Sequence, residues 1–258
     1  MAVGGTPRQR VVRVGTLVAV LVLWQLLIGT LHVFRPIILP APVTILQTLA
    51  TLLGTDQFVN AIVVTFRRVI LASIGASVVG VLLGLSMGWN ETVKAVSFPI
   101  VSAVYPLPKV SLLPLLMLIF GIGERAFVIT VAIAATFLVM FNAMRGVDDI
   151  GNLYFEVAKD NGAASTYAYF REVLLPGALP MIFTGLRLTL NTALLVTISV
   201  EFVAARQGLG SIIWTSWNTL QTPTMYAAVL VVMLAGVVIT YGLDMLAGYA
   251  MPWRVEVA

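Results

Sequence analysis

The sequence contains no cysteine and a single histidine, His32. Disulfide bonds and thiolate-bound metals are therefore excluded, and one imidazole cannot form a metal cluster. Only 10% of the 258 residues are charged, whereas 60% are hydrophobic, and the mean hydropathy is +1.02. A soluble domain carries about 25% charged residues. The composition therefore predicts an integral membrane protein.

Several catalytic motifs are also absent. The chain has neither a G-x-x-x-x-G-K-[ST] phosphate loop nor an H-E-x-x-H zinc motif. Gly75-Ala76-Ser77 begins like a nucleophile elbow but lacks the final glycine. We therefore expect a non-catalytic protein that binds no cofactor itself. In a soluble protein, a net charge of +4 would suggest binding to nucleic acid. In a membrane protein, the positions of the basic residues instead set how the protein is oriented in the membrane. We therefore expect no nucleic-acid partner.

Six apolar stretches are each long enough to cross a hydrocarbon layer of about 30 Å. They lie near residues 14–33, 62–87, 98–120, 126–144, 181–204 and 225–247. These stretches predict an all-α, polytopic membrane protein with one transmembrane domain over residues 1–258. The third stretch contains four prolines, so we expect it to be bent or to be preceded by an interfacial piece.

The distribution of basic residues predicts that both termini are cytoplasmic, because cytoplasmic loops carry an excess of Lys and Arg. In that orientation the cytoplasmic side holds Arg8, Arg10, Arg13, Lys94, Arg145, Lys159, Arg171 and Arg254. The external side holds the smaller set Arg35, Arg67, Arg68, Arg125 and Arg206. The polar segment 145–180, between the fourth and fifth spans, then lies in the cytoplasm.

This polar segment predicts a helix, a sharp corner and a second helix. The first helix is expected from Asn152 to Asn161, where Gly162 can adopt the left-handed backbone of a C-cap. The second is expected to begin near Ser165, a good N-cap residue, and to stop at Pro176. From these residues alone the segment is a docking site for a soluble partner, a solvated connector or a helix on the membrane surface.

The spacing of Glu156-Val157-Ala158, Gly162 and Leu175-Pro176 closely resembles the EAA loop of permease subunits in ATP-binding-cassette (ABC) importers. Two departures are visible. Val157 replaces the usual alanine, and the interval from Gly162 to Pro176 is one residue longer than usual, with Ala163-Ala164 the expected place of the addition.

Three further stretches resemble one subgroup, the nitrate, sulfonate and taurine importer permeases. The first runs from Tyr105-Pro106-Leu107-Pro108-Lys109 to Phe120-Gly121-Ile122-Gly123-Glu124. The second is the external connector Leu39-Pro40-Ala41-Pro42-Val43, and the third joins Glu201 to Gly208-Leu209-Gly210 and Gln221-Thr222. The likeness extends over most of the chain, from Trp24 to Leu246.

The resemblance implies a type I ABC importer permease fold in the bacterial cytoplasmic (inner) membrane. The short helix between spans four and five would be a coupling helix that docks into a cytoplasmic ABC ATPase dimer, where ATP and Mg are bound. The other implied partners are a second permease copy in a homodimer, an external substrate-binding protein and the lipid bilayer. The implied substrate is a small anion or organic solute such as nitrate, a sulfonate or taurine. The implied coupling residues are Glu156, Ala158, Gly162, Ser165, Tyr169, Phe170 and Pro176.

Polar side chains within the spans are candidates for the translocation pathway, because intramembrane charges must face a cavity or a partner. The candidates are Lys109, Arg187, Asn191, Thr192, Ser199 and Glu201. For Asn191, Thr192 and Ser199 the alternative is hydrogen bonding to the neighbouring backbone and helices. Arg187 and Glu201 are expected either to form structural pairs or to gate the pathway. Lys109 would either attract an anion or pair with a carboxylate.

Span two carries Ala72, Ala76, Gly80, Gly84 and Gly88 at every fourth position, which predicts one continuous face for close helix packing. The face is either a static contact, which we favour, or a sliding surface, and the pattern does not identify its partner helix.

A gradient-driven secondary transporter or channel is the alternative function. It would place coupling carboxylates at mid-membrane, whereas Glu201 and Asp244 are expected near opposite ends of their spans.

Overall fold

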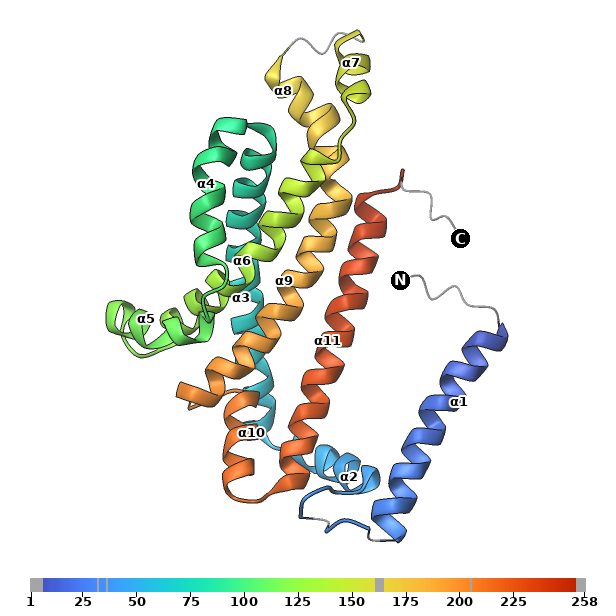
Figure 1. Cartoon of the computed structure of the whole chain (residues 1–258). Coiled ribbons are helices and arrows are strands. Elements are labelled where there is room, and N and C mark those ends of the chain that lie inside the picture. The colour runs from blue at the N-terminus through green and yellow to red at the C-terminus, as the bar shows by residue number, and fades with distance from the viewer. Residues whose placement is uncertain (1–6, 32, 36, 161–164, 205, 254–258) are drawn as a thin grey trace.

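The computed structural model describes residues 7–31, 33–35, 37–160, 165–204 and 206–253, and within these ranges all regular structure is helical (Figure 1). The elements are α1 (Pro7–Trp24), η1 (Gln25–Thr30), α2 (Pro42–Leu53), α3 (Asp56–Trp89), α4 (Glu91–Val104), η2 (Lys109–Leu112), α5 (Leu113–Phe120), α6 (Glu124–Asp148), α7 (Asn152–Asp160), α8 (Thr166–Tyr169), η3 (Phe170–Leu174), α9 (Leu175–Ala204), α10 (Leu209–Asn218) and α11 (Thr222–Ala250). The prediction of an all-α protein is confirmed.

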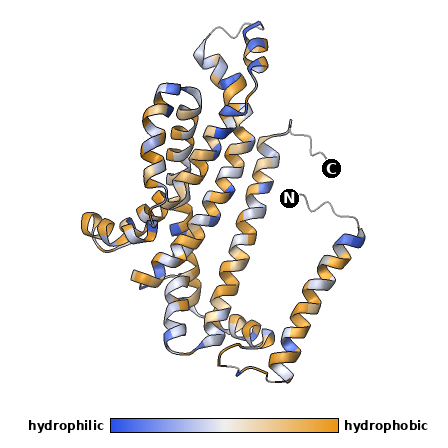
Figure 2. Ribbon diagram, viewed as in Figure 1, coloured by the Kyte–Doolittle hydropathy of each residue, from blue (hydrophilic) through white to orange (hydrophobic). Residues whose placement is uncertain are grey.

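Among the described residues, four helices are long and apolar enough to cross a membrane: α3, α6, the continuous run Thr166–Ala204, and α11. Helix α4 and the η2–α5 segment pass the same test only as a pair, which is bent by 90° and would make a fifth crossing if it counts as one span. This bend confirms the expectation for the proline-rich third stretch. The first predicted span corresponds to a shorter apolar helix, Val14–Thr30. Hydrophobic residues dominate all of these helices (Figure 2).

The predicted helix stop at Pro176 is wrong. The helix passes from α8 through the π-helical turn η3 into α9, which contains both Pro176 and Pro180. A π-turn bonds residue i to i+5 and so changes the hydrogen-bond register. Pro176 is the second residue of the α-helical segment that follows the π-turn, and the helix continues past it. The polar corner is therefore continuous with span five.

The small-residue face of α3 packs against α6 of the same chain, which answers the question of its partner helix. A Cβ atom added at Gly84 would lie 2.7 Å from the Cβ of Ala143, and one added at Gly88 would lie 2.6 Å from that of Val147. Such distances leave no room for a side chain. The two backbones are in close contact because the glycines permit it.

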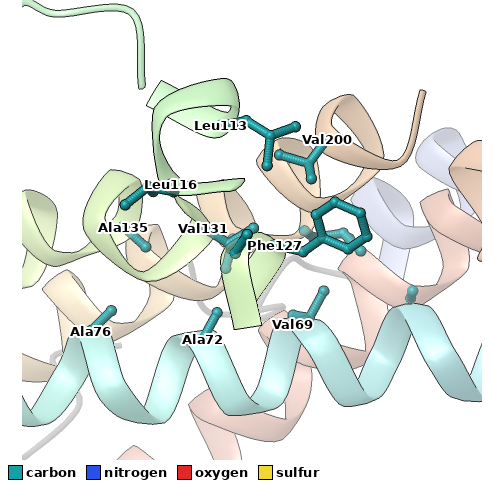
Figure 3. Packing of buried hydrophobic residues seen from close by; sticks show 13 residues of the cluster. Val69, Ala72, Ala76, Leu113, Leu116, Phe127, Val131, Ala135 and Val200 are labelled. Atoms are coloured by element: carbon teal, nitrogen blue, oxygen red, sulfur yellow. The ribbon is translucent and has the colours of Figure 1, made fainter. Parts of the chain in front are cut away.

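The main core lies where α3, α5, α6 and α9 meet (Figure 3). Figure 3 shows Val69 and Ala72 of α3 below Phe127 and Val131 of α6, with Leu113 of α5 above them. By contrast, α1 stands apart from the other long helices and joins them only through its lower end near α2 (Figure 1).

Candidate transport and coupling sites

The most strongly connected polar group is a buried cluster around Arg68 of α3 and Glu201 of α9. Arg68 Nη1 donates to Glu201 Oε1 at 2.7 Å, and Arg68 Nε donates to Glu124 Oε2 at 3.0 Å. A second contact joins Arg68 Nη2 to Glu124 Oε1. The side chains of Arg68 and Glu201 are only 4% and 0% exposed. One arginine therefore bridges two carboxylates from two other helices, and Arg67, with Nη2 3.4 Å from Glu124 Oε2, supplies the second positive charge.

Glu201 also holds the start of α10. Gly210 N donates to Glu201 Oε2 at 2.8 Å, and Thr65 Oγ1 donates to Glu201 Oε1 at 2.9 Å. The same hydroxyl accepts a bond from Leu209 N at 2.8 Å. These contacts satisfy two of the backbone N–H groups that a helix N-terminus leaves free, and the negative charge suits that end of the helix dipole.

The Gly208-Leu209-Gly210 motif is explained by this packing. Gly208 has φ +120°, a conformation that side chains rarely adopt, and a Cβ there would collide with the Glu201 carboxylate. A Cβ at Gly210 would lie 2.6 Å from the Cβ of Glu201. The two glycines therefore allow the turn to close over the buried carboxylate.

The cluster also fixes the turn between α9 and α10, because Arg68 Nη1 donates to the carbonyl oxygen of Gln207 at 2.7 Å. It thus joins α3, α6, α9 and this turn at the end of the bundle opposite the α7–α8 corner (Figure 1). Glu201 is expected from the sequence to pair or to gate. Its partner Arg68 is not predicted, because from the sequence Arg68 is expected only as a charge at the outer edge of span two.

Arg187 of α9 contacts Asp244 of α11 as an ion pair. Both side chains are about one third exposed, at 36% and 35%. The pair joins the two helices toward the opposite end of the bundle from Glu201, and it gives Arg187 the partner that an intramembrane cation requires.

Lys109 lies beside aromatic rings. Its Nζ is 4.5 Å from the centroid of the Tyr105 ring and 5.6 Å from that of Phe137, and it donates to the carbonyl oxygen of Tyr105. These distances are typical of cation–π contacts. No ion pair joins Lys109 to a carboxylate of the described residues. Of the two alternatives, carboxylate pairing is therefore not observed there.

The uncharged pathway candidates of α9 differ in their surroundings. Ser199 Oγ donates to the carbonyl oxygen of Leu195 in its own helix at 3.0 Å, which is the local bonding expected of a membrane hydroxyl. Asn191 and Thr192 are half-buried on the same helix. The neighbouring Thr189 is buried and donates to Ala135 O of α6 at 3.2 Å.

The corner formed by α7 and α8 projects beyond the bundle (Figure 1). Ser165 is the N-cap of α8, as predicted, with Oγ accepting from Ala168 N at 3.1 Å. The Phe155 ring centroid lies 6.3 Å from that of Tyr169 and 6.0 Å from that of Trp89. These rings attach the corner to the end of α3.

Several large apolar side chains of the corner remain exposed. Tyr154 is 68%, Tyr167 70% and Phe170 39% exposed. Glu156 is also exposed, whereas Ala158 is half-buried. The predicted C-cap Gly162, with Asn161 and Ala163-Ala164, lies outside the described residues, so the place of the additional residue stays a prediction. Exposed apolar groups on a polar projection are typical of a protein contact.

Residues 76–252 match the family of binding-protein-dependent transport system inner membrane components. The chain belongs to this family of ABC importer permeases. The permease is 31% identical over 255 residues to the taurine transport system permease protein TauC of Escherichia coli K12, a match that covers 97% of this chain and 92% of TauC.

Two further matches agree with this membership. The permease is 26% identical over 235 residues to the putative aliphatic sulfonates transport permease protein SsuC of Bacillus subtilis 168, covering 91% of this chain and 84% of SsuC. Its fold is similar to a chain of the MetNI methionine ABC transporter in an inward-facing conformation, with a TM-score of 0.66 and 20% identity, covering 74% of this chain and 94% of that chain. The type I importer fold expected from the resemblance is confirmed, and a gradient-driven carrier is not favoured.

Proposed function

We propose that this permease forms, with a second copy of itself, the pathway of an importer for a small anion or organic solute of the taurine, sulfonate or nitrate class. The substrate class is supported by the names of its relatives, TauC and SsuC. An external binding protein would deliver the substrate. The whole chain would act as one transmembrane domain with both termini in the cytoplasm.

The observation that carries the coupling proposal is the projecting corner with its exposed aromatic side chains. Tyr167 and Phe170 lie at the start of a helical run that continues without a break into α9. A separate cytoplasmic ATPase would bind this corner and would hold the ATP and Mg. Residues from Glu156 to Pro176 would form the contact, with Gly162 at its turn.

The continuity of the helix suggests how movement would reach the pathway. ATP binding would draw two ATPase subunits together and displace the two corners. Because η3 and α9 follow α8 directly, the displacement would be transmitted along α9 as a rigid element. The ion pair of Arg187 with Asp244 would transmit the displacement to α11. The contact of Glu201 with Arg68, which also binds Glu124, would transmit it to α3 and α6.

The pathway itself would be lined by Lys109 and by half-buried polar residues of α9, among them Asn191 and Thr192. Lys109 would meet the anion at the bend before α5, where the chain turns away from regular helix. Its present contacts with aromatic rings leave the ammonium group without a fixed counter-charge among the described residues.

The coupling proposal is tested by charging the exposed apolar surface of the corner. Phe170→Glu should lower the amount of ATPase that co-purifies with the permease by about tenfold or more, because a carboxylate would be buried in an apolar contact. The permease should remain inserted in the membrane. The measurement is ATPase recovered per permease after affinity purification, with ATP-driven uptake in proteoliposomes.

The matched control is Leu220→Glu, which adds the same charge to an exposed apolar side chain at the opposite end of the bundle. It should leave ATPase recovery unchanged. Recovery of wild-type amounts of ATPase with Phe170→Glu would remove the docking assignment.

A further inference from the structure

A polar cavity lies at the end of the bundle that carries α10, opposite the α7–α8 corner. Its volume is about 510 Å³, which falls within the range of about 300–1,000 Å³ common for small-molecule sites. It lies between the start of α3, the turn after α9, α10 and the start of α11. Its lining includes Gln57, Phe58, Asn60, Arg206, Gln207 and Ile212.

The chemistry of the lining favours an anion. Arg206 is the only charged side chain among the described residues that line the cavity, and it makes no ion pair with a described carboxylate. Gln57 and Asn60 of α3 add neutral amide donors. A guanidinium group presents paired N–H donors that match the oxygens of a planar or tetrahedral oxyanion.

We propose that this cavity is a binding site for a small oxyanion, of the sulfonate or nitrate class, held by Arg206. The assignment rests on the proposed importer function, in which this end of the molecule is external. The site would receive the anion on the outer side before it enters the pathway. Phe58 and Ile212 offer an apolar wall for a short organic tail.

The buried cluster around Arg68 holds the chain that directly follows Arg206. Arg206 is followed by Gln207, whose carbonyl oxygen accepts a hydrogen bond from Arg68, and by Gly208, which packs on the Glu201 carboxylate. These two residues therefore connect the cavity wall to both α3 and α9. Holding this part of the wall in place lowers the conformational entropy that anion binding would have to remove.

The charge of Arg206 is also left available. Within the neighbouring cluster, Arg67 and Arg68 face Glu124 and Glu201, so two cations meet two carboxylates. Those carboxylates are already engaged by Arg68, and none of them lines the cavity. An entering anion would therefore meet a guanidinium that forms no ion pair with a carboxylate in the described part of the chain.

Equilibrium binding to the purified permease–ATPase complex in nanodiscs, without the binding protein, tests the site. The probes are radiolabelled ethanesulfonate and, separately, nitrate. We expect saturable binding of at least one probe to the wild type, and a loss of affinity of about tenfold or more with Arg206→Gln, since charge-assisted hydrogen bonds are lost. Arg206→Lys should bind with intermediate affinity, because it keeps the charge but not the paired donors.

Arg35→Gln is the matched control. Arg35 is an exposed cation between η1 and α2 that does not line the cavity, and its loss changes the net charge equally. It should leave binding unchanged. The site is overturned if neither probe binds the wild type, if Arg206→Gln binds as tightly as the wild type, or if neutral ethanesulfonamide binds as well as ethanesulfonate.

These outcomes are separable from failure of the importer function. A complex that retains its ATPase and hydrolyses ATP, yet binds no anion through Arg206, contradicts the site alone. A permease that recruits no ATPase contradicts the proposed function itself.

Discussion

Glycine 208 shows how one residue can depend on a distant buried charge. Its backbone lies in the left-handed region, and its missing side chain leaves space for the Glu201 carboxylate. That carboxylate is in turn paired with Arg68. A single added methyl group at Gly208 would therefore strain the backbone and displace one partner of a buried ion pair.

The variant Gly208→Ala should destabilise the permease by about 1–3 kcal/mol, the typical cost of forcing a non-glycine residue into such a conformation. The measurement is the midpoint of thermal unfolding of the purified protein in detergent. Gly242→Ala provides the control, because a Cβ at Gly242 meets nothing within 4 Å. An equal midpoint for the two variants would contradict the role given to Gly208.

At the scale of the helix, α3 and α9 both contain residues that disfavour helix, glycines in α3 and prolines in α9, with different structural consequences. The glycines of α3 lie on one face and allow α6 to approach. The prolines of α9 follow a π-helical turn, so the helix continues where a stop is expected from the sequence. The spacing of small residues predicted the first feature, whereas the prediction that the helix stops at Pro176 was wrong because the sequence does not reveal the π-helical turn η3.

The contact of α3 with α6 predicts a difference between two alanine variants of one helix. Gly84→Ala should destabilise the permease by about 1–3 kcal/mol, as overpacking of a close contact does, since a Cβ there would lie 2.7 Å from that of Ala143. Gly75→Ala should be neutral or slightly stabilising, because a Cβ at Gly75 meets nothing within 4 Å and alanine favours helix. Unfolding midpoints that fall equally would indicate that the face is not tightly packed.

At the scale of the whole molecule, one chain leaves much apolar helix surface uncovered. In α1, Val11 is 71% and Leu17 67% exposed, and the helix stands apart from the others (Figure 1). Lipid can cover such side chains, and so can another subunit. Together with the one projecting corner among the described residues, where an ATPase is proposed to bind, this agrees with the proposal that each chain supplies half of a pathway.

The proposed homodimer predicts the mass of the intact complex. Native mass spectrometry of the complex released from mild detergent should show two copies of the 27.7 kDa chain for every two ATPase subunits, because each corner would occupy one ATPase. Dissociation of the ATPase by Phe170→Glu should leave the permease pair intact. A complex with one permease per ATPase pair would contradict this arrangement.

The class of this protein was predictable from particular residues. The scarcity of charge and the six apolar stretches identified a helical membrane protein, and the interval from Glu156 to Pro176 indicated an ABC importer permease. The small-residue face and the Ser165 cap were also predicted. The pairing of Arg68 and the cavity at Arg206 were not, because they bring together residues far apart in the sequence: Glu124 is 56 positions from Arg68 and Glu201 is 133 positions from it.

The sequence by itself determined what must be in the membrane, since transfer of apolar side chains from water depends mainly on composition and segment length. It also determined where tight turns and close contacts were permitted, since these depend on glycine at single positions. Only the tertiary structure decided which charges meet. An intramembrane ion pair requires two helices to bring their side chains within about 3 Å, and that distance depends on the packing of the whole bundle.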